Sequence, residues 1–331
     1  MTWKTKGYRA MNRQRKKIIE SSEISEVCTV TLGGYPQKIM LDGRYRSNPI
    51  VICLHGGPGS PVPFSVGCRG LFPDITEKYT LVCWDQLGCG INNRPLDESF
   101  RIEHFADMTV DLVREIRTRF PDNRLYLFGM SWGSILAAKA ALRAADMIDG
   151  VVIYGQVLRD LAYNDYVFEA LERSELPASK KKKLSAMRDQ RTEKNTRQIM
   201  GWIGKFTEGY NCRSGEPAPM KGIITGLLRS PDYRFRDFRA IMNNGYRKNK
   251  SLMIELFTVD LRQELAGVAV PYVIIQGDTD LVTPTQEVRA FMDGCGSGMI
   301  RLVEVKNSGH IPGKEGMERI FVELGDLAAR E

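Results

Sequence analysis

Short apolar segments recur along the chain, and each is bounded by residues that favour turns. From the third segment onward most are continuously apolar and do not alternate with polar residues, which is typical of parallel strands covered by helices on both faces. We therefore predict an α/β protein with a mostly parallel, eight-stranded sheet. The predicted strands are residues 28–32, 37–41, 50–54, 80–84, 124–128, 150–154, 272–276 and 299–305.

Segments with helical periodicity separate many of these strands. In residues 101–119 the apolar side chains recur about every 3.6 residues, and Pro121 ends the element. Residues 134–145 are rich in alanine, and the apolar side chains of residues 320–327 share one helical face. The alternation of strand and helix indicates a parallel sheet flanked by helices.

The alternation stops between about residue 155 and residue 269, where the sequence is charged, helical in character and without a convincing strand. An insertion of this kind predicts a mainly helical cap over the carboxyl edge of the strands, where open sheets bind ligands. We therefore divide the chain into a basic N-terminal arm (1–24), a core (25–155 and 270–331) and a cap (156–269).

The composition is that of an ordinary globular protein, with 331 residues, 43% of them hydrophobic and 26% charged. No apolar run approaches the roughly 20 residues that span a bilayer, and the N-terminus lacks the apolar stretch of a signal peptide. Seven scattered cysteines without a CxxC pair indicate buried thiols in a reducing compartment. We expect a cytoplasmic protein with no metal and no cofactor.

The net charge of +7 is concentrated at the N-terminus, where residues 1–20 hold seven Lys or Arg and one Glu. A basic arm with interleaved apolar residues can bind an anionic membrane surface or nucleic acid. The interpretation we favour is a solvated helix that leads into the first strand, and we expect no nucleic-acid partner. The lysine run at residues 180–183 is interpreted in the same way.

The first candidate for chemistry is Ser131, in the sequence Gly129-Met130-Ser131-Trp132-Gly133 between a predicted strand and a predicted helix. A serine on a sharp strand-to-helix turn requires small residues two positions before and after it, so that strand and helix can pass closely. Such a turn exposes the hydroxyl at the edge of the sheet, and the start of the helix favours a developing oxyanion. We interpret Ser131 as a nucleophile.

A serine hydroxyl needs a base to take its proton, and the chain has three histidines. His55 directly follows a predicted strand, and His104 lies on the polar side near the start of a predicted helix, so neither is placed as a free base. His310 follows the last predicted strand in a loop that reaches the carboxyl edge of the sheet. We therefore predict that His310 is the base.

A carboxylate must orient the imidazole and stabilise its charged form. The loop after the strand at 272–276 supplies Asp278 and Asp280. Both are possible on chemistry alone, and Asp278 can equally be a turn residue that bonds its own backbone. We favour Asp280 because it lies further from the strand end. The chain order of serine, aspartate and histidine is then that of the α/β-hydrolase fold.

Two backbone donors are needed for the oxyanion that forms during acyl transfer. One candidate is the amide of Trp132, directly after the serine. The loop after the third predicted strand reads His55-Gly56-Gly57-Pro58-Gly59, and its glycines allow the backbone to approach a substrate. We predict Gly57 as the second donor and Gly56 as a neighbour of the substrate.

Taken together, HGGPGSP, WDQLGCG at residues 84–90, GMSWG, GDTD and SGH resemble the proline iminopeptidase family of serine aminopeptidases, which has the α/β-hydrolase fold. The resemblance covers about residues 25–155 and 270–331. It implies an enzyme that releases the N-terminal residue of short peptides through an acyl-enzyme, with acidic residues of a cap binding the free amine. Leu87 replaces the family's usual arginine and Met130 replaces a glycine, which leaves the specificity open.

Several acidic residues of the predicted cap are candidates for binding the amine, and the sequence matches none of them to a family position. An esterase, lactonase or amidase that uses the same triad on a non-peptide small molecule is the alternative. A catalytically silent binding protein is a third interpretation, and the intact triad argues against it. The candidate acids are Glu169, Glu172, Glu208 and Glu255.

Overall fold

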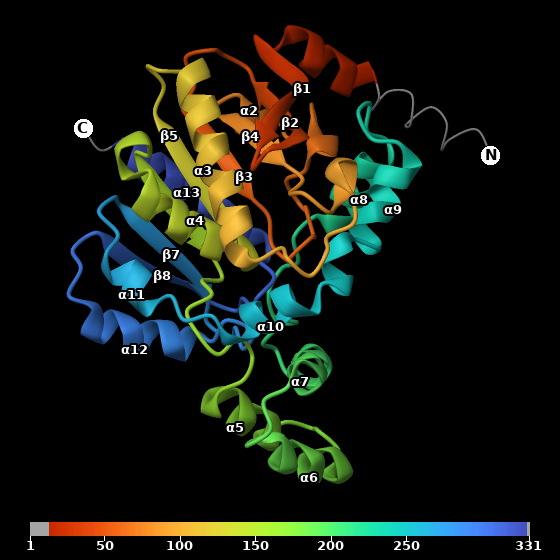
Figure 1. Ribbon diagram of the computed structural model, residues 1–331, viewed down its shortest axis with the longest axis vertical. Helices are drawn as coiled ribbons and strands as arrows, with labels where there is room; N and C mark the ends of the chain where they lie inside the picture. The colour runs from red at the N-terminus through yellow and green to blue at the C-terminus, as the bar shows by residue number, and fades with distance from the viewer. Residues whose placement is uncertain (1–12, 330–331) are drawn as a thin grey trace.

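A computed structural model describes residues 13–329 (Figure 1). Their strands form one eight-stranded sheet with the order β1-β2-β4-β3-β5-β6-β7-β8, which confirms the predicted fold class. The strands are β1 (Ile24–Leu32), β2 (Tyr35–Gly43), β3 (Ile50–Leu54), β4 (Thr80–Trp84), β5 (Leu125–Met130), β6 (Gly150–Tyr154), β7 (Tyr272–Gly277) and β8 (Ile300–Val305).

The sheet is parallel except at one edge. β1 pairs antiparallel with β2, and β2 pairs antiparallel with β4, whereas the pairings that link β4, β3, β5, β6, β7 and β8 are all parallel. Every residue of β3, β4, β5, β6 and β7 is buried, because helices cover both faces. This double burial is why these strands are continuously apolar in sequence.

Alternate residues of the strands face two separate layers of helices. Ile50 and Ile52 of β3 belong to the larger apolar cluster, which includes side chains of α3, α4 and α12. Val51 and Cys53 belong to the second cluster, which includes Ile320 of α13. The helices are α2 (Pro73–Thr76), α3 (Ile102–Arg119), α4 (Trp132–Arg143), α12 (Thr285–Cys295) and α13 (Lys314–Ala328), with short 3-10 helices η1 (Val66–Cys68), η2 (Gly90–Asn92) and η3 (Ala145–Met147).

The chain between β6 and β7 is helical. In Figure 1, α5, α6 and α7 extend away from the sheet, whereas α8 and α9 lie on the side where the described chain begins. These elements are α5 (Asp165–Arg173), α6 (Ala178–Met187), α7 (Glu193–Phe206), α8 (Met220–Leu228), α9 (Phe235–Met242), η4 (Gly245–Lys248), α10 (Lys250–Thr258) and α11 (Arg262–Ala266). We propose to treat residues 156–269 as the cap.

The N-terminal arm is described only in part. Residues 1–12 of the predicted arm lie outside the described residues, and residues 13–21 form a helix that precedes β1. No helix within residues 13–329 is long and apolar enough to cross a bilayer.

Candidate active site

Ser131 lies at the junction of β5 and α4 in a backbone conformation that non-glycine residues rarely adopt, with φ 51° and ψ −117°. The two flanking glycines are required by close contacts. A Cβ atom at Gly133 would lie 1.9 Å from the carbonyl oxygen of Leu54, and one at Gly129 would lie 2.8 Å from the carbonyl oxygen of Gly133. The tight turn therefore depends on glycine at both positions, and it presents the serine side chain at the end of β5.

Three side chains remote in sequence form a hydrogen-bonded series at this end of the sheet. The Oγ atom of Ser131 lies 2.9 Å from Nε2 of His310, and Nδ1 of His310 lies 2.9 Å from Oδ2 of Asp280. The exposed fractions are 9%, 5% and 0% respectively. An ionised carboxylate only accepts hydrogen bonds, so Nδ1 carries the proton and Nε2 is left to accept from the serine hydroxyl.

The carboxylate of Asp280 is held by its own loop. It accepts hydrogen bonds from the backbone N–H groups of Val282 (2.8 Å) and Thr283 (3.0 Å) and from the hydroxyl of Thr283 (2.7 Å). These donors fix the orientation of a carboxylate that has no contact with solvent. The structure thus brings Asp280 to the imidazole, whereas Asp278 accepts the backbone N–H of Ser308 at 3.1 Å.

The other two histidines have structural partners. Nδ1 of His55 donates to the carbonyl of Gly56 at 2.9 Å, and its Nε2 accepts the backbone N–H of Gln86 at 3.0 Å. Burial lowers the pKa of His55 to about 4, so its imidazole is neutral near pH 7. Nδ1 of His104 accepts the backbone N–H of Arg101 at 3.0 Å, at the start of α3. Neither imidazole has Ser131 among its hydrogen-bond partners.

The two predicted oxyanion donors lie beside the serine. Trp132 is the first residue of α4, and the first N–H groups of a helix have no partner within the helix. Gly57 has φ +119°, and a Cβ atom there would lie 2.8 Å from the backbone nitrogens of Gly59 and Ser60. Gly57 lines the same cavity as Ser131. Only glycine therefore allows the loop to adopt this turn next to the serine.

Gln86, from the WDQLGCG motif, is a residue of this site to which the sequence assigned no role. Its side-chain oxygen accepts the indole N–H of Trp132 at 2.8 Å, and its side-chain nitrogen donates to the carbonyl of His55 at 3.3 Å. The buried amide thereby links the loop before Gly57 to the first residue of α4. This link joins the WDQLGCG motif to the two segments that carry the predicted oxyanion donors.

The cavity at Ser131 is small and lined mainly by apolar side chains, with a volume of about 130 Å³. Leu161, Met200 and Tyr210 reach it from the segment between β6 and β7. No local pattern in the sequence marks these three residues as part of a site. No Asp or Glu is among the lining residues, which are Gly56, Gly57, Ser60, Val62, Met130, Ser131, Leu161, Met200, Tyr210, Val282, His310 and Ile311.

The four acidic residues proposed for binding an amine are not brought together at this cavity. Glu169 and Glu172 are exposed on α5, and Glu169 pairs with Arg173 at 2.9 Å. Glu255 accepts the backbone N–H of Ile102 at 2.9 Å and so caps the start of α3. The remaining acid, Glu208, lies two residues before the cavity-lining Tyr210 and pairs with Arg213 at 3.1 Å.

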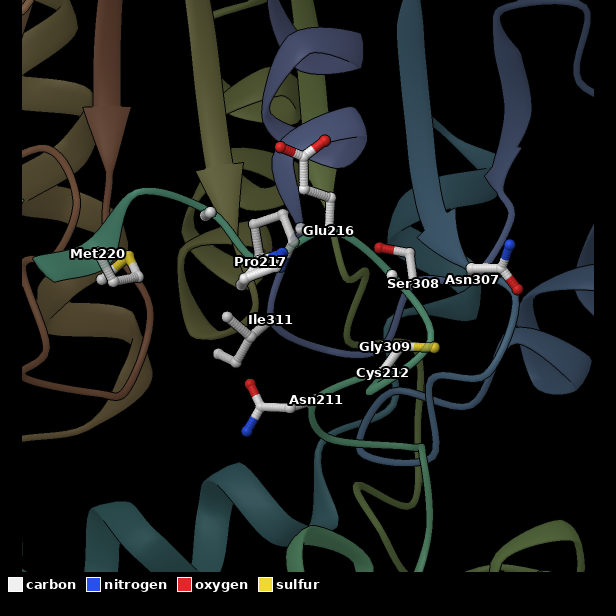
Figure 2. Close-up of a pocket in the computed structure, with 13 residues that line it drawn as sticks. Asn211, Cys212, Glu216, Pro217, Met220, Asn307, Ser308, Gly309 and Ile311 are labelled. Carbon is white, nitrogen blue, oxygen red and sulfur yellow. The ribbon is translucent and has the colours of Figure 1, made fainter.

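The 208–216 segment, which follows α7, forms backbone hydrogen bonds to both loops that carry the candidate triad. Figure 2 shows a pocket lined by Asn211, Cys212 and Glu216 of this segment and by residues 307–309 of the loop that leads to His310. The carbonyl oxygen of Gly209 accepts the N–H groups of Leu281 and His310, each at 3.2 Å. The carbonyl oxygen of Tyr210 accepts the N–H of Ile311 at 2.9 Å. The two loops are therefore held against the cap by main-chain contacts.

Tyr210 also places its ring near the imidazole. The ring centroids of Tyr210 and His310 are 6.1 Å apart with an interplanar angle of 38°. Burial raises the pKa of the Tyr210 phenol, so the hydroxyl is neutral near pH 7. The ring packs beside the proposed base without adding charge to the cavity.

Within residues 13–329, no group of three or more His, Cys, Asp or Glu side chains could hold a metal ion. All seven cysteines are free, and four of them are buried.

Comparisons with known proteins agree with the fold. Residues 49–316 match a family model described as the alpha/beta hydrolase fold. The probable aminopeptidase YbaC of Bacillus subtilis is 25% identical over 305 residues, which are 89% of this chain and 93% of that protein. A proline iminopeptidase of Flavobacterium johnsoniae is 29% identical over 247 residues, which are 73% and 78% of the two chains.

A solved structure extends the comparison to three dimensions. The crystal structure of a proline iminopeptidase from Mycobacterium smegmatis aligns with a TM-score of 0.59 and 19% identity, over 92% of this chain and 100% of that chain. At that identity the match shows a shared fold alone. Together with the two relatives, it confirms the resemblance inferred from the motifs.

Proposed function

The chain belongs to the α/β-hydrolase fold family, and from this we propose that it is a serine hydrolase in which Ser131 is the nucleophile, His310 the base and Asp280 the carboxylate that orients the base. The observation that carries the proposal is the buried series of two 2.9 Å hydrogen bonds that joins these side chains. The strained φ of the serine supports it, because such strain is typical of functional positions.

The proposed reaction proceeds through an acyl-enzyme. Nε2 of His310 takes the hydroxyl proton as Oγ of Ser131 attacks the acyl carbon, and Asp280 stabilises the imidazolium. The amides of Gly57 and Trp132 donate to the oxyanion. When the tetrahedral intermediate collapses, the imidazolium gives its proton to the leaving group. Water then attacks the acyl-enzyme with the same histidine as base, which regenerates the serine.

The substrate that we propose first is a short peptide with a free, apolar N-terminal residue. Two observations support this choice. The relatives include proteins named as a probable aminopeptidase and as a proline iminopeptidase. The cavity of about 130 Å³ has the size and apolar lining to hold one small side chain, such as a proline ring.

A second candidate is an esterase or amidase that acts on an acyl group without a free amine. It is favoured by the absence of any carboxylate from the residues that line the cavity at Ser131. A buried ammonium group without an acidic partner is costly, so the lining suits an uncharged acyl group better.

The free cysteines support a further proposal, that the protein works in a reducing, cytoplasmic setting. Disulfide formation requires an oxidising compartment, and none of the seven thiols is paired.

Labelling with a fluorophosphonate tests the proposed chemistry. The wild-type chain should be labelled on Ser131, and Ser131→Ala should lose the label while its circular dichroism spectrum stays unchanged. An unlabelled but folded wild-type chain would contradict the hydrolase proposal and favour a binding protein on this fold.

A substrate panel then separates the two candidates. Hydrolysis of proline or alanine naphthylamide, but not of the N-acetylated forms, is expected of an aminopeptidase. Equal or faster hydrolysis of the N-acetylated forms, or turnover of p-nitrophenyl esters alone, would favour the esterase or amidase.

A further inference from the structure

The outer face of α8 and α9 exposes large apolar side chains. Phe235 is 76% exposed, Met242 63% and Leu228 54%. Single exposed apolar residues are common, but a group of them on neighbouring elements marks a contact surface. Ile224, one turn before Leu228 on α8, is 41% exposed and extends the group.

These side chains are not the ones that hold the two helices in place. Ile223 and Leu227 of α8 are buried in a cluster with Cys68 of the core, and Phe238 of α9 packs against it. Each helix therefore has a packed inner face and a separate apolar surface that faces solvent.

The charges on this part of the cap are mainly basic. Residues 220–242 contain five Lys or Arg and two Asp. Both acids are engaged and largely buried: Asp232 pairs with Arg69 at 2.7 Å, and Asp237 accepts the backbone N–H of Arg234 at 2.8 Å. The exposed charges are therefore positive, and they include Arg236, Arg239 and Lys221.

The described part of the basic arm lies beside the same helices (Figure 1). The guanidinium of Arg15 is buried and donates to the carbonyls of Gly226 (2.8 Å) in α8 and Gly67 (2.7 Å) in the core. This contact fixes the helix of residues 13–21 against α8. It leaves Arg13, Lys16 and Lys17 exposed, with Lys16 in an exposed ion pair with Glu20 at 3.5 Å. Two segments with a net positive charge, about 200 residues apart in sequence, therefore meet on one side of the molecule.

We propose that this surface, formed by the outer faces of α8, α9 and residues 13–21, binds an anionic lipid membrane. Apolar side chains such as Phe235 and Met242 can enter the boundary between headgroups and acyl chains, while lysine and arginine stay at the phosphates. Each basic residue near an anionic leaflet adds to the attraction, and added salt screens it.

Other occupants fit the surface less well. In a symmetric dimer the same surface would face itself, so the basic residues of two copies would repel each other. Nucleic acid satisfies the positive charge through its phosphates but offers no apolar phase for exposed Phe and Met side chains. An anionic membrane satisfies both features.

Vesicle flotation of the full chain tests the proposal without any measurement of activity. The protein should float with phosphatidylcholine vesicles that contain phosphatidylserine, and added salt should release it. The double variant Phe235→Ser/Met242→Ser should lower the partition coefficient about tenfold, because two inserted side chains are lost. Met299→Ser/Val322→Ser is the matched control, since those side chains are 47% and 48% exposed elsewhere, and its partition coefficient should not change.

Several results would overturn the proposal. One is no binding to the anionic vesicles, and another is equal binding to vesicles of phosphatidylcholine alone. Sedimentation that shows a dimer in the wild type and a monomer in Phe235→Ser/Met242→Ser would assign the surface to a second copy. Salt-sensitive binding to heparin without binding to vesicles would assign it to an acidic polymer. Fluorophosphonate labelling is independent of all these outcomes, so failure here leaves the hydrolase proposal intact.

Discussion

Two stretches of the chain between β6 and β7 stand in opposite relation to the candidate triad. The 208–216 segment bonds through its main chain to the loops that carry Asp280 and His310. Helix α5 carries two of the acids first proposed for substrate binding, Glu169 and Glu172, and both are exposed, Glu169 in an ion pair with Arg173. The 208–216 segment contacts the site because it packs against the loops at the carboxyl edge of the sheet. Acidic side chains alone did not identify the stretch that contacts the site.

The two kinds of contact also differ in energy. Exposed ion pairs contribute roughly 0 to 1 kcal/mol each, because solvent screens them. Backbone hydrogen bonds to loops that surround a buried site leave costly unpaired groups when they are broken. If this comparison is right, substitutions should have effects that diminish from the triad to the 208–216 segment and then to α5.

The largest effect is expected at the triad itself. Ser131→Ala or His310→Ala should lower kcat by about a million-fold on the best substrate of the panel, because the nucleophile or its base is lost. The melting temperature should change little, since either alanine leaves the surrounding backbone contacts in place. Retention of more than a small fraction of kcat by pure variant protein would contradict the assignment.

The next effect distinguishes the two aspartates. Asp280→Asn should lower kcat by about 10⁴-fold, because the amide no longer fixes the imidazole tautomer. Asp278→Asn is the matched control, and its effect should be far smaller because Asp278 bonds the backbone of Ser308 and not the imidazole. Equal losses of kcat in the two variants would show that catalysis depends on the structure of the loop and not on the carboxylate of Asp280.

A glycine in the loop of His310 tests the contact with the 208–216 segment. A Cβ atom at Gly309 would lie 2.9 Å from the carbonyl oxygens of both Glu208 and Tyr210. Gly309→Ala should therefore displace the loop and lower kcat roughly 10- to 100-fold, with a loss of about 1–3 kcal/mol in the free energy of unfolding. Gly294→Ala is the control, because Gly294 lies on α12 and no atom lies near the added Cβ. This variant should lower neither kcat nor the free energy of unfolding. If Gly309→Ala keeps the kcat of the wild type, the contact with the 208–216 segment has no role in catalysis.

A buried acid that joins the cap to the core should make stability depend on pH. Asp85 accepts the hydroxyl of Tyr233 and the backbone N–H groups of Val66 and Ile91, and burial raises its pKa to about 6. Because the folded-state pKa lies above the unfolded value, this group stabilises the fold below about pH 4 and loses that contribution as pH rises toward 6.

Urea unfolding across this range measures the effect. The free energy of unfolding of the wild type, relative to Asp85→Asn, should fall by up to about 3 kcal/mol between pH 4 and pH 7. A difference between the two proteins that stays constant with pH would show that Asp85 does not titrate in this window.

The smallest effect is expected on α5. Glu169→Gln and Glu172→Gln should each change kcat/KM by less than about twofold, because both side chains are exposed and outside the cavity. Glu208→Gln is the informative companion, since Glu208 belongs to the 208–216 segment. A loss in kcat/KM of a free-amine peptide for Glu169→Gln, but not for Glu208→Gln, would reverse the comparison.

The sequence predicted the sheet well where strands are buried on both faces and less well at its edge. The interior strands are continuously apolar. The predicted bounds of β3, β4 and β6 match the observed ones, and those of β5 and β7 differ by at most two residues. β1 begins at Ile24, four residues before the predicted strand. The prediction missed this part of the strand because Ser25 and Glu26 are polar residues on a partly exposed edge. The hydroxyl of Ser25 bonds Asp42 of β2, a contact that no local pattern indicates.

The candidate site divides in the same way. Ser131, Asp280 and His310 could be selected because their side-chain chemistry occurs in recognisable local contexts. Gly209 contributes a carbonyl oxygen, which every residue has, so no sequence pattern distinguishes it. The place of Tyr210 and the hydrogen bonds of Gln86 depend on the packing of distant segments, and that information is absent from a single sequence.

One oxygen atom in this molecule receives hydrogen bonds from two loops at once. The carbonyl of Gly209 joins the loop of the acid, through Leu281, to the loop of the base, through His310. A shift of that oxygen by more than a few tenths of an ångström would weaken both bonds together. A displacement of residue 209 would therefore disturb the loops of acid and base together, so the alignment of the two side chains depends on a single backbone position outside both loops.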